Sequence, residues 1–123
     1  MAARVLIVED DQLIQRMYDK IFSFEKYEVI TASDGEEGLE KAREVHPDII
    51  LMDLRMPIMD GLKAIRELKK DPAVSDIPVI VISAWANKKN REEAIKAGAI
   101  KFFEKPTNYN TLLATIRDTI EGG

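Results

Sequence analysis

Cysteine is absent from this chain, and histidine and tryptophan occur only once each. Without cysteine there is no disulfide framework, no thiolate zinc site and no cysteine nucleophile. Long hydrophobic runs are missing too, because the apolar stretch at 77–87 is far shorter than the ~18 residues of a membrane-spanning helix. A basic excess is also lacking, since 18 Lys and Arg stand against 22 Asp and Glu. The net charge of −4 argues against direct binding to nucleic acid or to an anionic membrane.

The length and composition point to one folded domain. A chain of 123 residues is long enough to bury a core without cross-links. With 46% hydrophobic and 33% charged residues, it has the composition of a folded protein rather than a disordered one. Only four apolar residues separate Arg4 from Glu9, so we expect no signal peptide. These features predict a cytoplasmic protein with a single domain at 1–123 and no second domain in this chain.

Five short apolar runs alternate with five amphipathic stretches. The runs lie at 5–8, 28–32, 48–52, 79–82 and 99–103. Three of them are continuous, as expected for strands buried on both faces, whereas 28–32 alternates like an edge strand. The stretches between them have apolar residues at helical spacing. This alternation predicts an α/β fold: a doubly wound, five-stranded parallel sheet with helices on both faces.

Charged and polar side chains follow four of the predicted strands. They are Glu9, Asp10 and Asp11 after the first strand, Asp53 after the third, Ser83 after the fourth and Lys105 just beyond the fifth. Ligands of open α/β folds bind outside the carboxyl ends of the strands. We therefore expect three carboxylates, a hydroxyl and an ammonium group to converge on one site.

The predicted cluster calls for a metal cation. Glu9, Asp10 and Asp53 cannot all ionise close together without strong repulsion unless a cation lies among them, and Lys105 offsets only one carboxylate. Hard oxygen ligands select Mg²⁺, or Mn²⁺, rather than zinc. A carboxylate beside such a metal, with a lysine and a hydroxyl nearby, suits phosphoryl transfer to aspartate itself.

Four motifs in order carry a family resemblance. They are VLIVEDD at 5–11, MDLRMPIMDG at 52–61, VISA at 81–84 and FEKP at 103–106. Together they resemble the receiver domain of two-component response regulators, over essentially the whole chain. The resemblance implies a flavodoxin-like sheet of order 2-1-3-4-5 and a phosphorylation-dependent signalling switch. Both a stand-alone receiver and a domain cut from a longer regulator or hybrid kinase fit this resemblance.

The resemblance also implies roles for the site residues. Asp53 would accept a phosphoryl group from a phosphohistidine of a partner, while Ser83 and Lys105 would contact the phosphoryl oxygens. Such a protein catalyses its own phosphorylation and slow dephosphorylation without turning over a small-molecule substrate.

Mg²⁺ is the cofactor that the resemblance implies. Asp10 would bind it directly, Glu9 through water, and Asp53 and the backbone carbonyl of Arg55 would complete the protein ligands. Glu9 stands where this family often has aspartate, and its longer side chain is expected to loosen the metal shell.

The resemblance further implies a switch at Phe102 and Ser83. Phe102 would turn inward when Ser83 moves toward the phosphoryl group, altering the face made by the fourth helix, fifth strand and fifth helix. Phenylalanine in place of the family's tyrosine removes a hydroxyl hydrogen bond. The bond between Lys105 and Pro106 is expected to be cis, which would direct the ammonium group inward.

Two bulky residues flank the predicted phosphoryl position. Arg55 lies two residues after Asp53, and Trp85 lies two residues after Ser83. We hypothesise that they set the lifetime of the aspartyl phosphate by shielding it from water. For Trp85, covering the interface of the fourth helix is an alternative role.

Other polar residues have structural interpretations. Asp11 and Asp60 are expected to cap helices, and His46 to be a solvated residue near a helix end rather than a phosphodonor. The phosphodonor would then belong to a sensor histidine kinase or a histidine phosphotransfer protein.

The basic stretch at 88–97 is either a solvated face or a surface for a downstream target. An output domain in a longer parent protein is the alternative target.

The sequence disfavours two other functions. A flavin or nucleotide carrier needs a Gly- or Ser/Thr-rich phosphate loop after the first strand, where this chain has three acids that would repel an anion. A degenerate receiver that serves only as an interaction module would have a broken acidic pocket, whereas all five functional positions are filled here.

Overall fold

The apolar runs form the strands of one parallel sheet. The computed structural model describes residues 2–122. The strands are β1 (Arg4–Val8), β2 (Glu28–Ala32), β3 (Ile49–Met52), β4 (Val79–Ser83) and β5 (Lys101–Glu104). They lie in the order β2-β1-β3-β4-β5, and every neighbouring pair is parallel. The predicted fold class and strand order are therefore confirmed.

Strand burial follows the apolar pattern of the sequence. All residues of β3 and β4, and all of β1 except Arg4, are buried, whereas the edge strands β2 and β5 are only partly so. The fifth strand begins later than predicted, because Ala99 donates its N–H to the Ala94 carbonyl at 3.0 Å and so closes the preceding helix. Its neighbour Ile100 donates to Val79 at 2.9 Å, where the ladder with β4 starts.

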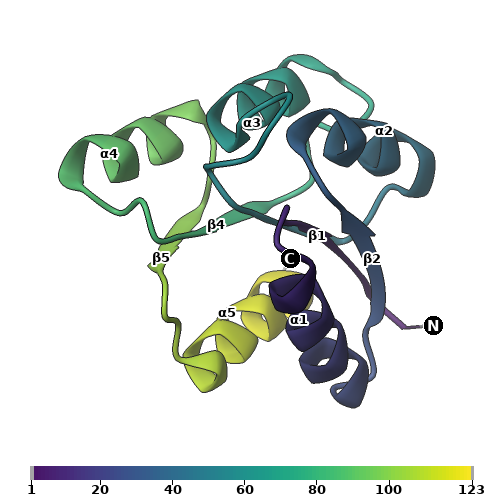
Figure 1. Ribbon diagram of the computed structural model, residues 1–123. Coiled ribbons are helices and arrows are strands. Elements are labelled where there is room, and N and C mark those ends of the chain that lie inside the picture. The colour runs from purple at the N-terminus through teal and green to yellow at the C-terminus, as the bar shows by residue number, and fades with distance from the viewer. Residues whose placement is uncertain (1, 123) are drawn as a thin grey trace.

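Five helices cover the two faces of the sheet. They are α1 (Gln12–Phe24), α2 (Gly35–Val45), α3 (Gly61–Lys70), α4 (Lys88–Ala97) and α5 (Tyr109–Glu121). Figure 1 shows α1 and α5 on one face and α2, α3 and α4 on the other. Side chains that alternate along the strands therefore supply two separate apolar cores, one under each helical layer. None of the helices within 2–122 is long and apolar enough to cross a membrane.

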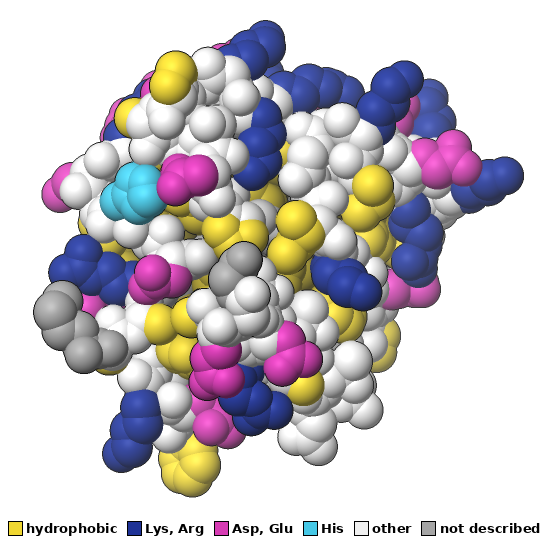
Figure 2. All heavy atoms as spheres, turned by 180° about the vertical axis from the view of Figure 1, so that it is seen from behind, with side chains coloured by type: hydrophobic (Ala, Val, Ile, Leu, Met, Phe, Trp, Pro, Cys, Tyr) yellow, Lys and Arg dark blue, Asp and Glu magenta, His cyan; other side chains and the backbone are white. Residues whose placement is uncertain are grey.

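The predicted structural residues occupy the expected places. Asp11 caps α1 by accepting N–H bonds from Leu13 at 2.9 Å and Ile14 at 3.2 Å, and Asp60 caps α3 in the same way. His46 follows the end of α2 in a left-handed conformation, with its side chain exposed 3.5 Å from Asp76. Figure 2 shows this histidine (cyan) on the side of the molecule that faces away from the viewer in Figure 1.

Two phenylalanines of α1 provide a matched test of the core under α1 and α5. Phe22 is completely buried there, whereas Phe24 is 82% exposed at the end of the helix. We expect Phe22→Ala to lower the free energy of unfolding by about 3–5 kcal/mol, because it removes buried surface and leaves a cavity. Phe24→Ala should change it by less than about 1 kcal/mol. Urea denaturation of both variants tests this, and equal losses would contradict the assigned burial.

Candidate functional site

The predicted site residues meet at the carboxyl edge of the sheet. Main-chain bonds continue the ladder beyond the strand ends and place three of them. Asp53 donates its N–H to Val8 at 3.1 Å, and Lys105 donates to Ser83 at 3.0 Å. The N–H of Glu9 donates to the carbonyl of Ala32, the last residue of β2, at 2.9 Å. The positions of these side chains are thus fixed by sheet geometry rather than by flexible loops.

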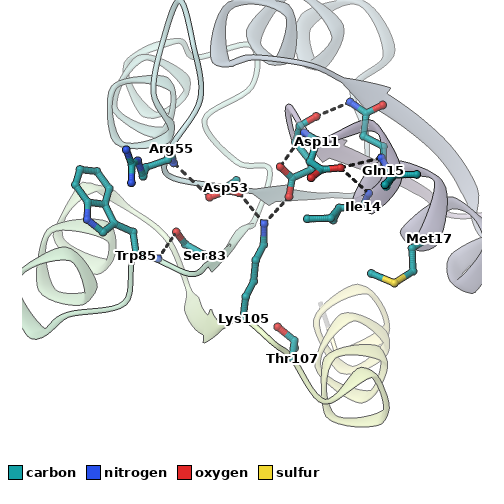
Figure 3. Close-up of polar contacts among 12 residues, drawn as sticks. Asp11, Ile14, Gln15, Met17, Asp53, Arg55, Ser83, Trp85, Lys105 and Thr107 are labelled. Carbon is teal, nitrogen blue, oxygen red and sulfur yellow. Dashed lines mark hydrogen bonds and ion pairs between the residues drawn. The ribbon is translucent and has the colours of Figure 1, made fainter.

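Lys105 lies between two buried carboxylates. Its Nζ is 2.5 Å from Oε1 of Glu9 and 2.7 Å from Oδ2 of Asp53 (Figure 3). The sequence interpretation expected this lysine to offset one carboxylate, and the structure shows it shared between two. The peptide bond from Lys105 to Pro106 is cis, as predicted.

Burial strongly affects the protonation of the cluster. Removal from water raises the pKa of the Glu9 carboxyl to about 7; the hydrogen bond from Lys105 opposes this shift, and the charge of Asp53 adds to it. Burial also disfavours the charged form of Lys105, but its hydrogen bonds to Asp53 and Glu9 prevail and hold the pKa of this ammonium above its ordinary value. The lysine is therefore a fixed positive charge across the physiological range.

The same cluster has the donor set of a hard metal ion. Glu9, Asp10 and Asp53 each offer a carboxylate oxygen, and these oxygens lie within 4.8 Å of one another. Asp10 is exposed and opens the cluster to solvent, whereas the other two are buried. With all three acids ionised, Lys105 leaves two negative charges uncompensated, which a divalent cation would balance. Oxygen ligands of this kind fit Mg²⁺.

The loop after β1 is held by a residue that sequence reasoning missed. The side-chain amide of Gln15 donates to the backbone carbonyl of Glu9, and to Ala32 at 3.2 Å and Ser33 Oγ at 3.3 Å. Gln15 thereby joins the end of β1, where Glu9 begins the acidic loop, to the end of β2. Glutamine on a helix carries no motif, so nothing in the sequence singled it out.

The loop after β3 approaches the sheet closely. The N–H of Arg55 donates to Oδ1 of Asp53 at 3.3 Å, and that of Gly61 donates to the Leu54 carbonyl at 2.9 Å. A Cβ atom at Gly61 would lie 2.1 Å from the carbonyl oxygen of Asp53, so only glycine fits there. This close approach holds the start of α3 against the main chain of Asp53 and Leu54.

Arg55 and Trp85 stack beside the acidic cluster, as Figure 3 shows. The guanidinium carbon of Arg55 is 5.0 Å from the centre of a Trp85 ring. The N–H of Trp85 donates to Oγ of the buried Ser83 at 3.0 Å. A hollow of about 410 Å³ opens next to this pair, and its lining residues are Asp10, Leu54, Arg55, Met56, Asp60 and Trp85.

Phe102 lies apart from the acidic cluster. It stands opposite Val81 in the register of β4 and β5, and its partly buried ring packs against the core under α2, α3 and α4. The guanidinium carbon of Arg91 lies 4.9 Å from the ring centre. This contact was not predicted, because nothing in the sequence distinguishes Arg91 from the other basic residues of the stretch at 88–97.

Comparison with known proteins identifies relatives over nearly the whole chain. The family model described as "Response regulator receiver domain" matches residues 5–117. The polar-differentiation response regulator DivK of Brucella ovis is 36% identical over 117 residues, 95% of each chain. The response regulator PleD of Caulobacter vibrioides is 40% identical over 117 residues, and the chain spans only 26% of its length.

A solved structure has the same architecture. It is the receiver domain of the sensor histidine kinase PA1611 from Pseudomonas aeruginosa PAO1, described with a magnesium ion coordinated in its active-site cleft. Its TM-score to this protein is 0.91, at 28% sequence identity, and the match covers 98% of this chain and 99% of the other.

The pKa of Glu9 predicts a specific pH dependence of stability without metal. The folded pKa of about 7 exceeds the ordinary value of 4.5, so between these values the folded state holds a proton that the unfolded state has lost. The stability of the wild type relative to Glu9→Gln should therefore be greatest below pH 4.5, fall as the pH rises to about 7, and then level off. We expect a total fall of about 1–3 kcal/mol, measured by urea denaturation in the presence of a chelator. A difference that stays constant or grows with pH would contradict the raised pKa.

Proposed function

The chain belongs to the response regulator receiver domain family, whose members act in phosphorylation-dependent signalling, and on that premise we propose that Asp53 is its phosphoacceptor. One observation carries this proposal: Asp53 is a buried carboxylate that contacts a lysine at 2.7 Å inside a cluster of metal-binding oxygens. A carboxylate in such surroundings is a nucleophile whose product, an acyl phosphate, would find a positive charge beside it.

The proposed reaction is transfer from a phosphohistidine of a partner protein. A carboxylate oxygen of Asp53 attacks phosphorus, the P–N bond breaks, and the imidazole leaves with the bonding electrons. Lys105 and the hydroxyl of Ser83 would offset the charge that develops on the equatorial phosphoryl oxygens. Lys105 already lies 2.7 Å from the Asp53 carboxylate, so its charge would lower the barrier without a rearrangement, whereas Ser83 would first move toward the phosphoryl group.

The phosphodonor would come from another molecule. The single histidine, His46, precedes β3, whereas Asp53 follows it, so the length of the strand separates the two side chains. A sensor histidine kinase or a histidine phosphotransfer protein is the donor class that fits. Both act in the cytoplasm, where we place this protein.

Mg²⁺ would be held by this chain's own oxygens, with Mn²⁺ as a substitute. Asp10 is the exposed carboxylate through which the ion would enter, Glu9 and Asp53 supply the buried oxygens, and the backbone carbonyl of Arg55 would complete the set. When bound, the ion neutralises charge on the phosphoryl group and orients it.

The proposed output is a rearrangement of the surface made by α4, β5 and α5. Ser83 and Phe102 would move together and alter this surface for a downstream partner. DivK is matched over 95% of its length and PleD over 26%, so relatives include a short protein and a much longer one. We propose that residues 1–123 form one receiver domain, whose output passes to a target protein or to an output domain of a longer parent.

Phosphorylation by a small donor tests the assignment of Asp53. Incubation of the wild type with acetyl phosphate and Mg²⁺ should add the mass of one phosphoryl group, and a chelator should abolish the reaction. Asp53→Asn should add none, because its amide is not a nucleophile. The matched control is Asp60→Asn, which changes an exposed acid of the same loop and keeps a side chain that can cap α3.

Three results would remove the support for this assignment. Labelling of Asp53→Asn would contradict the phosphoacceptor, and loss of labelling in Asp60→Asn would show that the loop rather than the nucleophile was disturbed. A wild type that takes up no phosphoryl group would instead favour an interaction module without phosphotransfer.

The stacked pair of Arg55 and Trp85 leads to a second kinetic expectation. Because these side chains stack beside the acidic cluster, we propose that they hinder the approach of water to the aspartyl phosphate. Trp85→Ala and Arg55→Ala should each speed dephosphorylation by about 3- to 30-fold, which corresponds to about 0.6–2 kcal/mol in the barrier. Loss of radiolabelled phosphate after removal of the donor measures this rate. Unchanged rates in both variants would rule out shielding.

A further inference from the structure

Arg91 of α4 contacts three residues that lie on two other segments, the β4–α4 loop and β5. Its Nε donates to the carbonyl of Ala86 in the loop before the helix, at 2.9 Å. One terminal nitrogen lies 3.1 Å from a carboxylate oxygen of Glu104 on β5. Its guanidinium carbon is 4.9 Å from the centre of the Phe102 ring, also on β5. One side chain thus joins the β4–α4 loop, α4 and β5.

The loop that Arg91 holds begins at the candidate site. The N–H of Trp85 donates to Oγ of Ser83 at 3.0 Å, and the carbonyl of Trp85 accepts from the side-chain amide of the buried Asn90 at 3.1 Å. Residues 84–86 are therefore held at one end by Ser83 and at the other by the first turns of α4. A movement of Ser83 would therefore be passed along this short segment to the Ala86 carbonyl.

Arg91 resists that movement because its partners lie on two different segments, Ala86 in the β4–α4 loop and Glu104 and Phe102 on β5. If the Ala86 carbonyl shifts, Arg91 must either lose this bond or follow it, and following it disturbs the contacts with Glu104 and Phe102. Phe102 has no hydroxyl, so a side-chain hydrogen bond cannot hold its ring, whereas the guanidinium group can. The arrangement therefore favours one position of the loop together with one position of the ring.

We propose that Arg91 is a positioning residue that locks the β4–α4 loop and Phe102 in the resting arrangement. This inference rests on the proposed function, since it concerns the response of the loop to a phosphoryl group on Asp53. By linkage, an interaction that stabilises the resting arrangement weakens the binding of a phosphoryl group that favours a shifted arrangement of the loop and the Phe102 ring. Removing the lock should therefore strengthen that binding.

Beryllofluoride, a stable mimic of an aspartate-bound phosphoryl group, is the probe for this effect. We expect Arg91→Ala to bind it about 5- to 30-fold more tightly than the wild type in the presence of Mg²⁺, measured by calorimetry. Glu104→Gln removes only the ion pair, which is exposed, and should tighten binding by about two- to fivefold. This milder variant tests the effect on beryllofluoride affinity even if Arg91→Ala folds poorly.

Lys88→Ala is the matched control. Lys88 is a highly exposed cation in the first turn of the same helix, and its ion pair is with Glu92 of α4 itself. This variant removes the same charge as Arg91→Ala and should bind beryllofluoride like the wild type.

Affinity separates a lock from an ordinary structural contact. A merely structural Arg91 would lower the stability to urea while leaving the affinity for beryllofluoride equal to or weaker than that of the wild type. Equal or weaker binding by both Arg91→Ala and Glu104→Gln would therefore overturn the lock, as would a gain in Lys88→Ala of the same size. A wild type that binds no beryllofluoride would contradict the proposed function, and the lock with it.

Discussion

The candidate site depends on the contacts of the Lys105 ammonium group with the carboxylates of Glu9 and Asp53. Without it, two buried carboxylates would face each other with no positive charge between them, an arrangement that proteins avoid by protonation or by rearrangement. The contact also crosses the sheet, because Lys105 follows β5 while Glu9 follows β1, with β3 and β4 between them. A parallel sheet with this strand order is what brings the three loops to one point.

The balance of charge explains why the site is suited to switching. Three carboxylates and one lysine are held within a small volume, so the site is short of positive charge when all its acids are ionised. Protonation of Glu9 and binding of a divalent cation are two ways to relieve that shortage. A phosphoryl group on Asp53, as proposed, would bring further negative charge to the same place, and the metal and Lys105 would offset it together.

The communication with the surface that we propose would pass through a short segment held by several hydrogen bonds. Ser83 ends a fully buried strand, and two residues later Trp85 is already tied both to Ser83 and to the first turns of α4. Arg91 extends this connection to β5 through Glu104 and Phe102. Because packed elements shift between discrete arrangements rather than deforming continuously, a small displacement at Ser83 would reach the face of α4 and β5 through these contacts.

The sequence by itself determined the order of strands and helices, the burial of the central strands on both faces, and the acids that follow these strands. It could do so because periodicity and turn residues act within a few positions of the chain. Its motifs also indicated the strand order and the cis bond before Pro106, both of which the structure bears out. Only the tertiary structure decided that Lys105 serves two carboxylates, 52 and 96 residues away in the chain. The same holds for the contacts of Gln15 and Arg91, whose residue types carry no signal in the sequence. Such contacts depend on how the packed elements place side-chain atoms in space. A local sequence pattern holds no information on the distance between residues that are far apart in the chain.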